Sequence, residues 1–325
     1  MDIKYFSNSP HIKGNNSTKK IMINIAIALL PACIAGSVFF GLQALLVLAL
    51  ALISAVASEL VYLLICKRPF KEIVAQFDFT SVVTGLLVGM VMSPSVPFYV
   101  PILASIFAIV VVKMLFGGTG KNIVNPAITG RIFAFLSFGI AMTSFPNPNF
   151  MPVDANIETG ATALTELLNG NFTISNLNLL LGIGVAGCIG ETCKLALIVG
   201  GIYLIIRDII DFKWPIIYIG VTGLFTVALN NFQFSYFLPS ILSGGLILGA
   251  IFMATDYTTT PNTQLGNIIY FVFLGLLTAG LRQATGIEVV SFAILLGNLI
   301  VPLIDKFITA RPFGYVKQTK NKGTK

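Results

Sequence analysis

Charged residues are scarce in this sequence. Asp, Glu, Lys and Arg make up 10% of its 325 residues, whereas 56% of the residues are hydrophobic. A soluble domain has roughly 25% charged residues, so this chain cannot cover a water-facing surface. The mean hydropathy of +0.90 leads to the same conclusion. The composition therefore predicts an all-α integral membrane protein whose outer surface faces the lipid bilayer.

Histidine and cysteine are also rare, which bears on metal binding. The only histidine is His11, and the four cysteines are Cys33, Cys66, Cys188 and Cys193. The cysteine spacing fits neither a zinc site nor a disulfide framework, so we interpret these residues as small buried side chains and predict no metal site. The net charge of +7 does not indicate a nucleic-acid partner, because the basic residues lie at the two ends and in short loops.

Long apolar runs are the dominant pattern of the chain. A membrane-spanning helix needs about 20 mostly apolar residues, and the runs predict about ten spans. These lie near residues 21–41, 43–65, 78–94, 98–116, 123–142, 188–206, 214–230, 237–255, 265–281 and 287–305. The segments 82–97 and 243–261 are rich in Gly and Pro, so we predict broken helices there, which are tolerated where protein or a cavity satisfies the backbone.

The Lys and Arg residues predict the orientation of the chain. With ten spans, the basic loops and both termini fall on one side, which is expected to be cytoplasmic. The stretch between the two sets of spans contains Asp154, Glu158 and Glu166 but no Lys or Arg, which agrees with an outer position. The predicted parts are a cytoplasmic segment at 1–20, a first transmembrane half at 21–142, an extracytoplasmic loop at 143–187, a second transmembrane half at 188–305 and a cytoplasmic basic tail at 306–325.

A short internal repeat relates the two transmembrane halves. Gly85-Leu86-Leu87-Val88-Gly89 is matched 160 residues later by Gly245-Leu246-Ile247-Leu248-Gly249. Five spans in each half is an odd number, so the second half would insert upside down relative to the first. We therefore predict two inverted five-helix repeats, an arrangement that often places a binding site or a conduction path at the interface of the repeats.

A glycine-rich motif precedes the fifth predicted span. Residues 117–127 have the sequence Gly-Gly-Thr-Gly-Lys-Asn-Ile-Val-Asn-Pro-Ala. Lys121 is followed by Asn122 and no strand precedes the motif, which excludes a nucleotide-binding P-loop. Two interpretations remain: a tight cytoplasmic turn that opens the fifth helix, or a backbone cradle for a polar cofactor that includes Asn122 and Asn125.

Two further motifs contain polar groups beside small residues. In the outer loop, Thr159-Gly160-Ala161-Thr162 fits either a helix start capped by one of its threonines or a threonine hydroxyl with room for a bulky phosphate. In the second half, an apolar span ends in Thr255-Asp256. The Asp256 carboxylate either ends the span, binds a cation or holds a flavin.

Several ionisable residues lie inside or beside the predicted spans. Charges at membrane depth are costly, so we expect them to face the bundle interior or a wet cavity. We predict a buried pairing of Lys113 and Arg131 with Glu59, and a mutual neutralisation of Glu191 and Lys194, which are three residues apart. Arg282 belongs to the same set.

Together these motifs resemble those of the RnfD/NqrB family of ion-pumping bacterial electron-transfer complexes. The resemblance is carried by the run from Lys113 to Ala127, by Gly190-Glu191-Thr192 and by the segment from Met253 to Pro261, which occur in the family order. It covers essentially the whole chain. The length is closer to the RnfD branch, because NqrB has a longer amino-terminal extension.

The resemblance implies a covalent flavin. In this family the last threonine of a Ser/Thr-Gly-Ala-Thr motif is joined to FMN through a phosphoester, which makes Thr162 the predicted acceptor and residues 143–187 a flavinylation loop. Thr159, Gly160 and Ala161 complete the motif. The sequence departs from the family pattern at Asn156, where an Asp is common, and this bears on recognition by the flavin transferase. The family also suggests a second, non-covalent flavin such as riboflavin.

The resemblance further implies a role in a multi-subunit complex of the bacterial cytoplasmic membrane. Rnf complexes pass electrons between ferredoxin and NAD and couple this transfer to translocation of Na⁺ or H⁺. The expected partners are RnfA, RnfB, RnfC, RnfE and RnfG, and this chain would relay flavin electrons without being catalytic alone. The alternatives are a cofactor-free secondary transporter or channel with inverted repeats, and a structural membrane scaffold.

Overall fold

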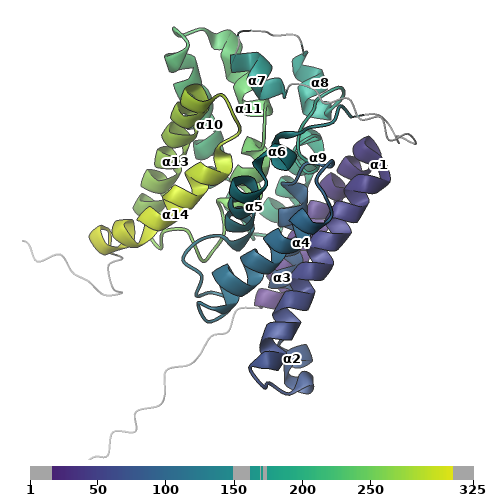
Figure 1. Cartoon of the computed structure of the whole chain (residues 1–325). Coiled ribbons are helices and arrows are strands. Elements are labelled where there is room, and N and C mark those ends of the chain that lie inside the picture. The colour runs from purple at the N-terminus through teal and green to yellow at the C-terminus, as the bar shows by residue number, and fades with distance from the viewer. Residues whose placement is uncertain (1–16, 149–161, 169, 171–173, 310–325) are drawn as a thin grey trace, which may run out of the picture.

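The computed structural model describes residues 17–148, 162–168, 170 and 174–309 (Figure 1). Within these ranges every regular element is a helix. An isolated parallel bridge joins Thr162 and Ala186. The all-α prediction is confirmed.

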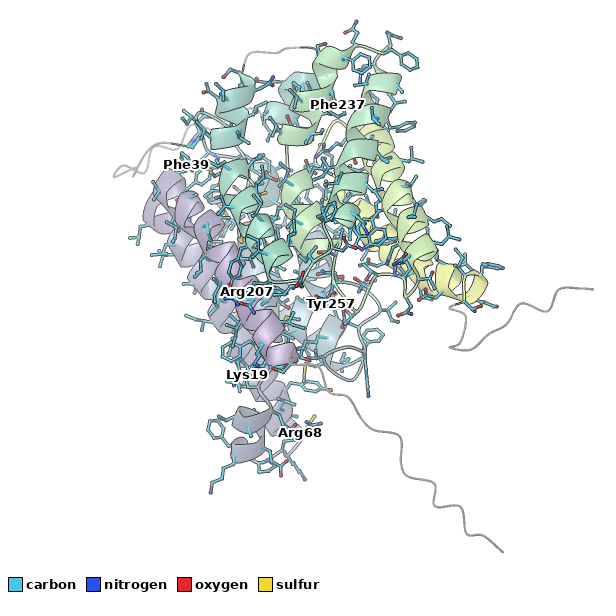
Figure 2. The ribbon with its side chains drawn as sticks, turned by 180° about the vertical axis from the view of Figure 1, so that it is seen from behind. Lys19, Phe39, Arg68, Arg207, Phe237 and Tyr257 are labelled. Carbon is cyan, nitrogen blue, oxygen red and sulfur yellow. The ribbon has the colours of Figure 1, made fainter. Side chains whose placement is uncertain are left out.

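The first two predicted spans form one long element, α1 (Thr18–Ile65), with a break at Gly41. Gly41 has φ 70° and ψ −155°, a conformation that side-chain-bearing residues rarely adopt. Figure 2 shows Lys19 and Arg68 towards one end of the molecule and Phe39 towards the other. The chain therefore turns back near Gly41, and the two parts of α1 correspond to the predicted spans 21–41 and 43–65.

The rest of the first half is built from short or broken helices. They are α2 (Phe70–Gln76), α3 (Thr80–Met90), α4 (Tyr99–Ile106), the π-helix η1 (Phe107–Met114), α5 (Pro126–Ser137) and α6 (Gly139–Thr143). The axes of α2 and α3 differ by 69°, and between them Phe79 takes a left-handed φ of 63°. The break thus lies before the predicted segment 82–97, which instead contains the end of α3 and the turn after it.

Two short helices, α7 (Ala163–Leu168) and α8 (Asn176–Leu181), precede the second half. The second half contains α9 (Lys194–Ile206), α10 (Lys213–Leu229), the 3₁₀ helix η2 (Phe234–Tyr236), α11 (Phe237–Leu242), α12 (Leu246–Leu248), the π-helix η3 (Gly249–Met253), α13 (Gln264–Thr285) and α14 (Val290–Phe307). A bend of 67° separates α11 from α12, and it falls inside the predicted broken segment 243–261.

Length and composition identify fewer spans than the sequence pattern predicts. Within the described part of the chain, three helices, α1, α13 and α14, are long and apolar enough to cross a membrane, and the count reaches five if each bent pair is one span. The combined α4 and η1 helix, α9 and α10 are apolar but shorter, at 10–17 residues. Bends and turns interrupt several of the predicted spans, so the count of ten spans stays a prediction. The inverted repeat also stays a prediction.

The outer surface of the bundle is apolar. Ile140 is 92% exposed and Ile206 is 74% exposed, as expected for side chains that face lipid. Inside, small residues let the backbones touch: a Cβ at Gly200 of α9 would collide with the carbonyl oxygen of Ala28 in α1. Of the cysteines, Cys33 and Cys188 are buried as predicted, but Cys66 is exposed because it ends α1.

Backbone hydrogen bonds tie the two halves together where α3 and η3 end. The Gly190 amide donates to the Met90 carbonyl at 2.7 Å, and the Ile189 amide donates to the Met92 carbonyl at 3.1 Å. From the first half, Asn125 Nδ2 donates to the Met253 carbonyl at 3.2 Å. Each half therefore satisfies carbonyl groups at the helix end of the other, and a polar pocket lies beside each junction.

Candidate functional site

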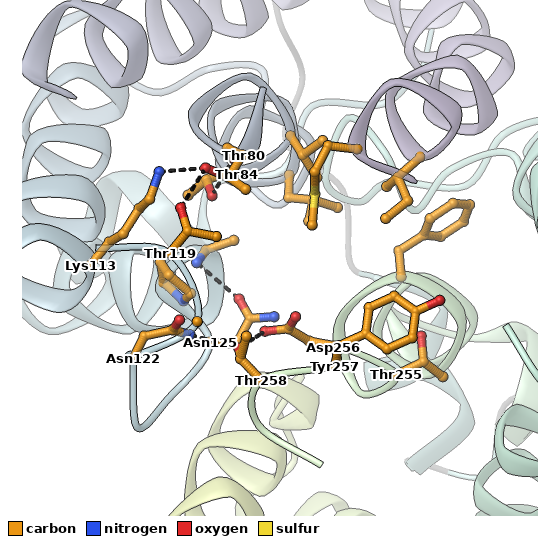
Figure 3. A pocket seen from close by; sticks show the side chains of 18 of the residues that line it. Thr80, Thr84, Lys113, Thr119, Asn122, Asn125, Thr255, Asp256, Tyr257 and Thr258 are labelled. Atoms are coloured by element: carbon orange, nitrogen blue, oxygen red, sulfur yellow. Dashed lines mark hydrogen bonds between the residues drawn. The ribbon is translucent and has the colours of Figure 1, made fainter. Parts of the chain in front are cut away.

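The first pocket, here called the inner pocket, has a volume of about 90 Å³ and is lined by both halves (Figure 3). Tyr257 lines it, and Figure 2 places Tyr257 in the same part of the molecule as Lys19 and Arg207. Its polar lining residues are Thr80, Thr84, Lys113, Thr119, Asn122, Asn125, Thr255, Asp256, Tyr257 and Thr258. The predicted site residues Asn122, Asn125 and Asp256 are thus brought together.

Asn125 fixes one wall of the inner pocket. Its side-chain oxygen accepts hydrogen bonds from the amides of Ala127 at 3.0 Å and Ile128 at 3.3 Å, which makes it the N-cap of α5. Pro126 suits the first position of a helix because it has no amide hydrogen to leave unpaired. The glycine-rich run before it takes left-handed φ values at Gly117, Gly118 and Gly120. The prediction of a tight turn that opens this helix is confirmed.

A hydrogen-bond chain links the two polar motifs across the inner pocket. Asn122 Nδ2 donates to Thr258 Oγ1 at 3.0 Å, and Thr258 Oγ1 donates to Asp256 Oδ2 at 3.0 Å. Burial raises the pKa of the Asp256 carboxyl from its ordinary value, while the hydrogen bond from Thr258 acts in the lowering direction. The motifs, far apart in sequence, therefore form one polar surface.

The opposite wall of the inner pocket carries a buried ion pair. Lys113 Nζ donates to Glu59 Oε1 at 2.8 Å and also to Thr80 Oγ1. The predicted pairing of Lys113 with Glu59 is confirmed. Arg131 does not join this pair: its Nη1 donates to Ser291 Oγ at 2.7 Å in another part of the bundle. That part of the prediction is wrong, because α5 carries Arg131 away from the Lys113 end of η1.

The second pocket, here called the outer pocket, has a volume of about 210 Å³ and contains Thr162. The helix α7, which follows Thr162 directly, lies at the end of the molecule opposite α2 (Figure 1). Charged residues line the pocket beside apolar ones: Arg131, Phe135, Met142, Phe145, Val185, Glu191, Lys194, Ile287 and Glu288. The outer pocket therefore combines an apolar surface with two cationic and two anionic side chains.

Thr162 caps α7, and its hydroxyl is less engaged than that of its neighbour. Thr162 Oγ1 accepts from the Thr165 amide at 3.4 Å. Thr165 Oγ1 donates to the Thr162 carbonyl at 2.7 Å, whereas the two hydroxyl oxygens are 3.3 Å apart. Since the Thr165 proton already serves the carbonyl, the Thr162 hydroxyl can be substituted with the loss of only a long hydrogen bond.

The charges around the outer pocket are arranged differently from the prediction. Lys194 Nζ donates to the Glu191 carbonyl rather than to its carboxylate, and Glu191 Oε1 accepts from the Cys188 amide at 2.8 Å. The residues are not helical neighbours, because α9 begins only at Lys194. The helical-neighbour spacing assumed in the prediction is therefore wrong, and no direct ion pair joins the side chains of Glu191 and Lys194 among the described residues.

Arg282 forms a buried ion pair with Glu288, which lines the outer pocket. Its Nη2 lies 2.9 Å from Glu288 Oε2, and its Nη1 donates to the Ser240 carbonyl at 2.9 Å. Gly244 lines the pocket with a left-handed φ of 65°, and a Cβ there would overlap Glu288 Oε2. Glycine is therefore the residue that fits at position 244, because a side chain there would collide with the ion pair of Arg282 and Glu288.

The sequence reasoning missed some residues of both pockets. Glu288 was not named among the predicted membrane charges, although it is the second residue of the predicted span 287–305, and a carboxylate at a span end is a signal that could have found it. Thr119 lines the inner pocket and lies within the glycine-rich motif, but it was not named as a site residue. Of the predicted flavinylation motif, Thr159, Gly160 and Ala161 lie outside the described residues, and only Thr162 is described.

Comparison with known proteins identifies the family. Residues 5–314 match the family described as NQR2, RnfD, RnfE, which is nearly the whole chain. The chain belongs to this family. The resemblance inferred from the motifs is confirmed.

Full-length relatives agree with this assignment. The chain is 40% identical over 318 residues to the D subunit of the Na⁺-translocating ferredoxin:NAD⁺ oxidoreductase complex of Acetobacterium woodii, covering 97% of this chain and 96% of the relative. It is 35% identical to the D subunit of the proton-translocating ferredoxin:NAD⁺ oxidoreductase complex of Clostridium ljungdahlii, with 95% of both chains covered. It is 31% identical to the D subunit of the ion-translocating oxidoreductase complex of Vibrio atlanticus, covering 96% of this chain and 99% of the relative.

Proposed function

We propose that this chain is the flavin-carrying membrane subunit of an ion-translocating ferredoxin:NAD oxidoreductase complex. The names of the full-length relatives support the complex. The observation that carries the flavin proposal is the position of Thr162, whose hydroxyl lies at a cavity of about 210 Å³ with buried cationic side chains. RnfA, RnfB, RnfC, RnfE and RnfG are the proposed partners, and a flavin transferase attaches the cofactor.

The residues of the outer pocket fit a covalent FMN. Thr162 would hold the phosphate as an ester, and Arg131 and Lys194 are the cationic groups of a pocket that also contains the carboxylates of Glu191 and Glu288, the second of which is paired with Arg282. Phe135 and Ile287 supply apolar surface for the ring. A bound flavin supplies reversible one- and two-electron chemistry. The chain itself positions the group and keeps bulk water away from one face of it.

A persistent fluorescent band distinguishes this function from the alternatives. A subunit with ester-linked FMN stays yellow after purification and fluoresces on a denaturing gel. A cofactor-free transporter or channel is colourless under the same conditions. The decisive variant is Thr162→Ala, whose expected result is given in the Discussion.

We propose that the inner pocket holds the second, non-covalent flavin, such as riboflavin. Asn122, Asn125 and Asp256 provide amide and carboxylate groups that suit the polar edge of a flavin ring. The present volume of about 90 Å³ requires side chains at the pocket mouth to move. Tyr257 is 53% exposed, and its movement would break the hydrogen bond from its hydroxyl to the Ile209 carbonyl.

The inner-pocket proposal predicts a selective loss of extractable flavin. In Asp256→Ala and Asn122→Ala we expect the amount of acid-extractable flavin per protein to fall at least about tenfold. Each variant removes one of the two hydrogen bonds that Thr258 makes with Asn122 and Asp256. The in-gel fluorescence of the covalent flavin should persist. Asn262→Ala is the control, since Asn262 binds Asp305 away from the pocket. Equal extractable flavin in all three variants would rule out the inner pocket.

We propose a topology of ten spans with both termini cytoplasmic, in the bacterial cytoplasmic membrane. The turn at Gly41 supports two spans within α1. The clustering of Lys19, Arg68 and Arg207 in one part of the molecule (Figure 2) supports a cytoplasmic face. The similar bends of 69° and 67° in the two halves support the inverted repeat.

Thiol labelling from the two sides of the membrane tests this topology. Cys66 is exposed, so we expect a membrane-impermeant thiol reagent to label it only in inverted vesicles. In a Cys66→Ser background, Asn169→Cys should react only in right-side-out cells. Labelling of both positions from the same side would contradict the odd number of spans in each half.

A further inference from the structure

The ion pair of Glu59 and Lys113 belongs to a longer chain of oxygen atoms. Thr80 Oγ1, which accepts a hydrogen bond from Lys113, donates to Asp78 Oδ1 at 2.5 Å. Thr119 Oγ1 donates to Asp78 Oδ2 at 2.6 Å. Thr119 is exposed, Asp78 is half-buried and Glu59 is buried. This series of hydrogen-bonded side chains therefore leads from the surface into the bundle along the wall of the inner pocket.

Within this set of hydrogen-bonded groups, the charges do not sum to zero, and one carboxylate oxygen has no hydrogen-bond partner among the described residues. Two carboxylates, Glu59 and Asp78, face one ammonium group, so the cluster carries one excess negative charge. Lys113 satisfies Oε1 of Glu59, but Oε2 is buried and has no hydrogen-bond partner among the described residues. The side chain of Glu59 is only 10% exposed. A buried charged oxygen without a partner costs free energy, and a bound cation would remove that cost.

We propose that Glu59, Asp78 and Thr80 form a binding site for a hard monovalent cation such as Na⁺, for which Lys113 competes. Carboxylate and hydroxyl oxygens are the ligands that hard cations prefer. A single positive charge makes the cluster neutral while Lys113 remains protonated. The Lys113 ammonium already donates to Glu59 Oε1 and Thr80 Oγ1, so it competes with the cation for these two oxygens.

This site deepens the proposed role in ion translocation, on which its physiological meaning rests. Cation binding itself requires no flavin. A Thr162→Ala protein that has lost its covalent flavin but still binds Na⁺ would separate the two proposals. Loss of flavin attachment and loss of the cation site are therefore distinguishable outcomes.

The test is Na⁺ binding to the purified full-length chain in detergent, with choline chloride holding the ionic strength constant. We expect Glu59→Gln and Asp78→Asn each to weaken ²²Na⁺ binding at least about tenfold. Lys113→Met should strengthen it by at least about the same factor, because the competing ammonium is gone. Glu72→Gln is the control, since Glu72 is an exposed carboxylate on α2 outside the cluster.

Thermal unfolding provides the second readout. In Lys113→Met the charge on Glu59 is uncompensated, so its unfolding temperature should rise with NaCl and not with choline chloride. The Lys113→Met/Glu59→Gln double variant should lose this difference. Asp78→Asn breaks no buried ion pair, so it reports on the site even if the Glu59 variant does not fold. Unchanged Na⁺ affinity in Asp78→Asn, or equal effects of the two salts on Lys113→Met, would overturn the proposal.

Discussion

Thr162→Ala is expected to abolish covalent flavin attachment completely. The hydroxyl of Thr162 is the proposed ester oxygen, and alanine leaves no nucleophile at that position. The measurement is in-gel fluorescence together with intact mass, on protein produced in a host that has a flavin transferase. The wild-type chain should show a fluorescent band and the FMN mass increment, and the variant should show neither.

Two neighbouring substitutions make this result specific. Thr162→Ser keeps a hydroxyl and should retain attachment at a reduced level. Thr165→Ala should keep attachment, although it removes the 2.7 Å hydrogen bond to the Thr162 carbonyl that helps to shape the start of α7. A Thr162→Ala protein that still carries the mass increment would transfer the role to another hydroxyl, and Thr165 would be the first to test.

Arg282→Met is expected to cause the largest loss of stability among single substitutions at the outer pocket. It leaves Glu288 as a mostly buried, unpaired carboxylate whose side chain is 13% exposed. It also removes the donor to the Ser240 carbonyl. Breaking one partner of a buried ion pair costs about 3–5 kcal/mol. Thermal unfolding in detergent should show a large fall in the midpoint temperature.

A double variant and a surface pair serve as controls for this prediction. Arg282→Met/Glu288→Gln should recover part of the lost stability, because no uncompensated charge remains. Lys213→Met breaks the pair with Asp211, whose atoms are 3.9 Å apart and whose side chains are 60% and 43% exposed. Exposed pairs contribute about 0–1 kcal/mol, so this variant should unfold close to the wild-type temperature. Equal losses in Arg282→Met and Lys213→Met would contradict a structural role for the buried pair.

The two pockets show how far motifs alone could locate a site. The family motifs pointed to Asn122, Asn125, Thr162 and Asp256, and the structure places Thr162 in one pocket and the other three in another. Of the charged residues that line the two pockets, the sequence analysis named all except Glu288. Glu288 stands at the start of the predicted span 287–305, where a carboxylate looks like an ordinary surface residue.

The sequence by itself determined the membrane environment, the all-helical class and the family. These follow from composition, from apolar run length and from motifs a few residues long, all of which are local properties of the chain. It also marked Gly117, Gly118 and Gly120 as a turn, because left-handed backbone conformations favour glycine.

Only the tertiary structure decided which polar groups meet. Lys113 and Arg131 are equivalent partners for Glu59 in the sequence, but η1 brings Lys113 to 2.8 Å while α5 directs Arg131 to Ser291. Likewise, Asn122 reaches Thr258 across 136 positions of sequence. Such contacts depend on where the helices bend and how closely they pack. Hydropathy and residue spacing do not contain that information, because they describe each segment without its neighbours.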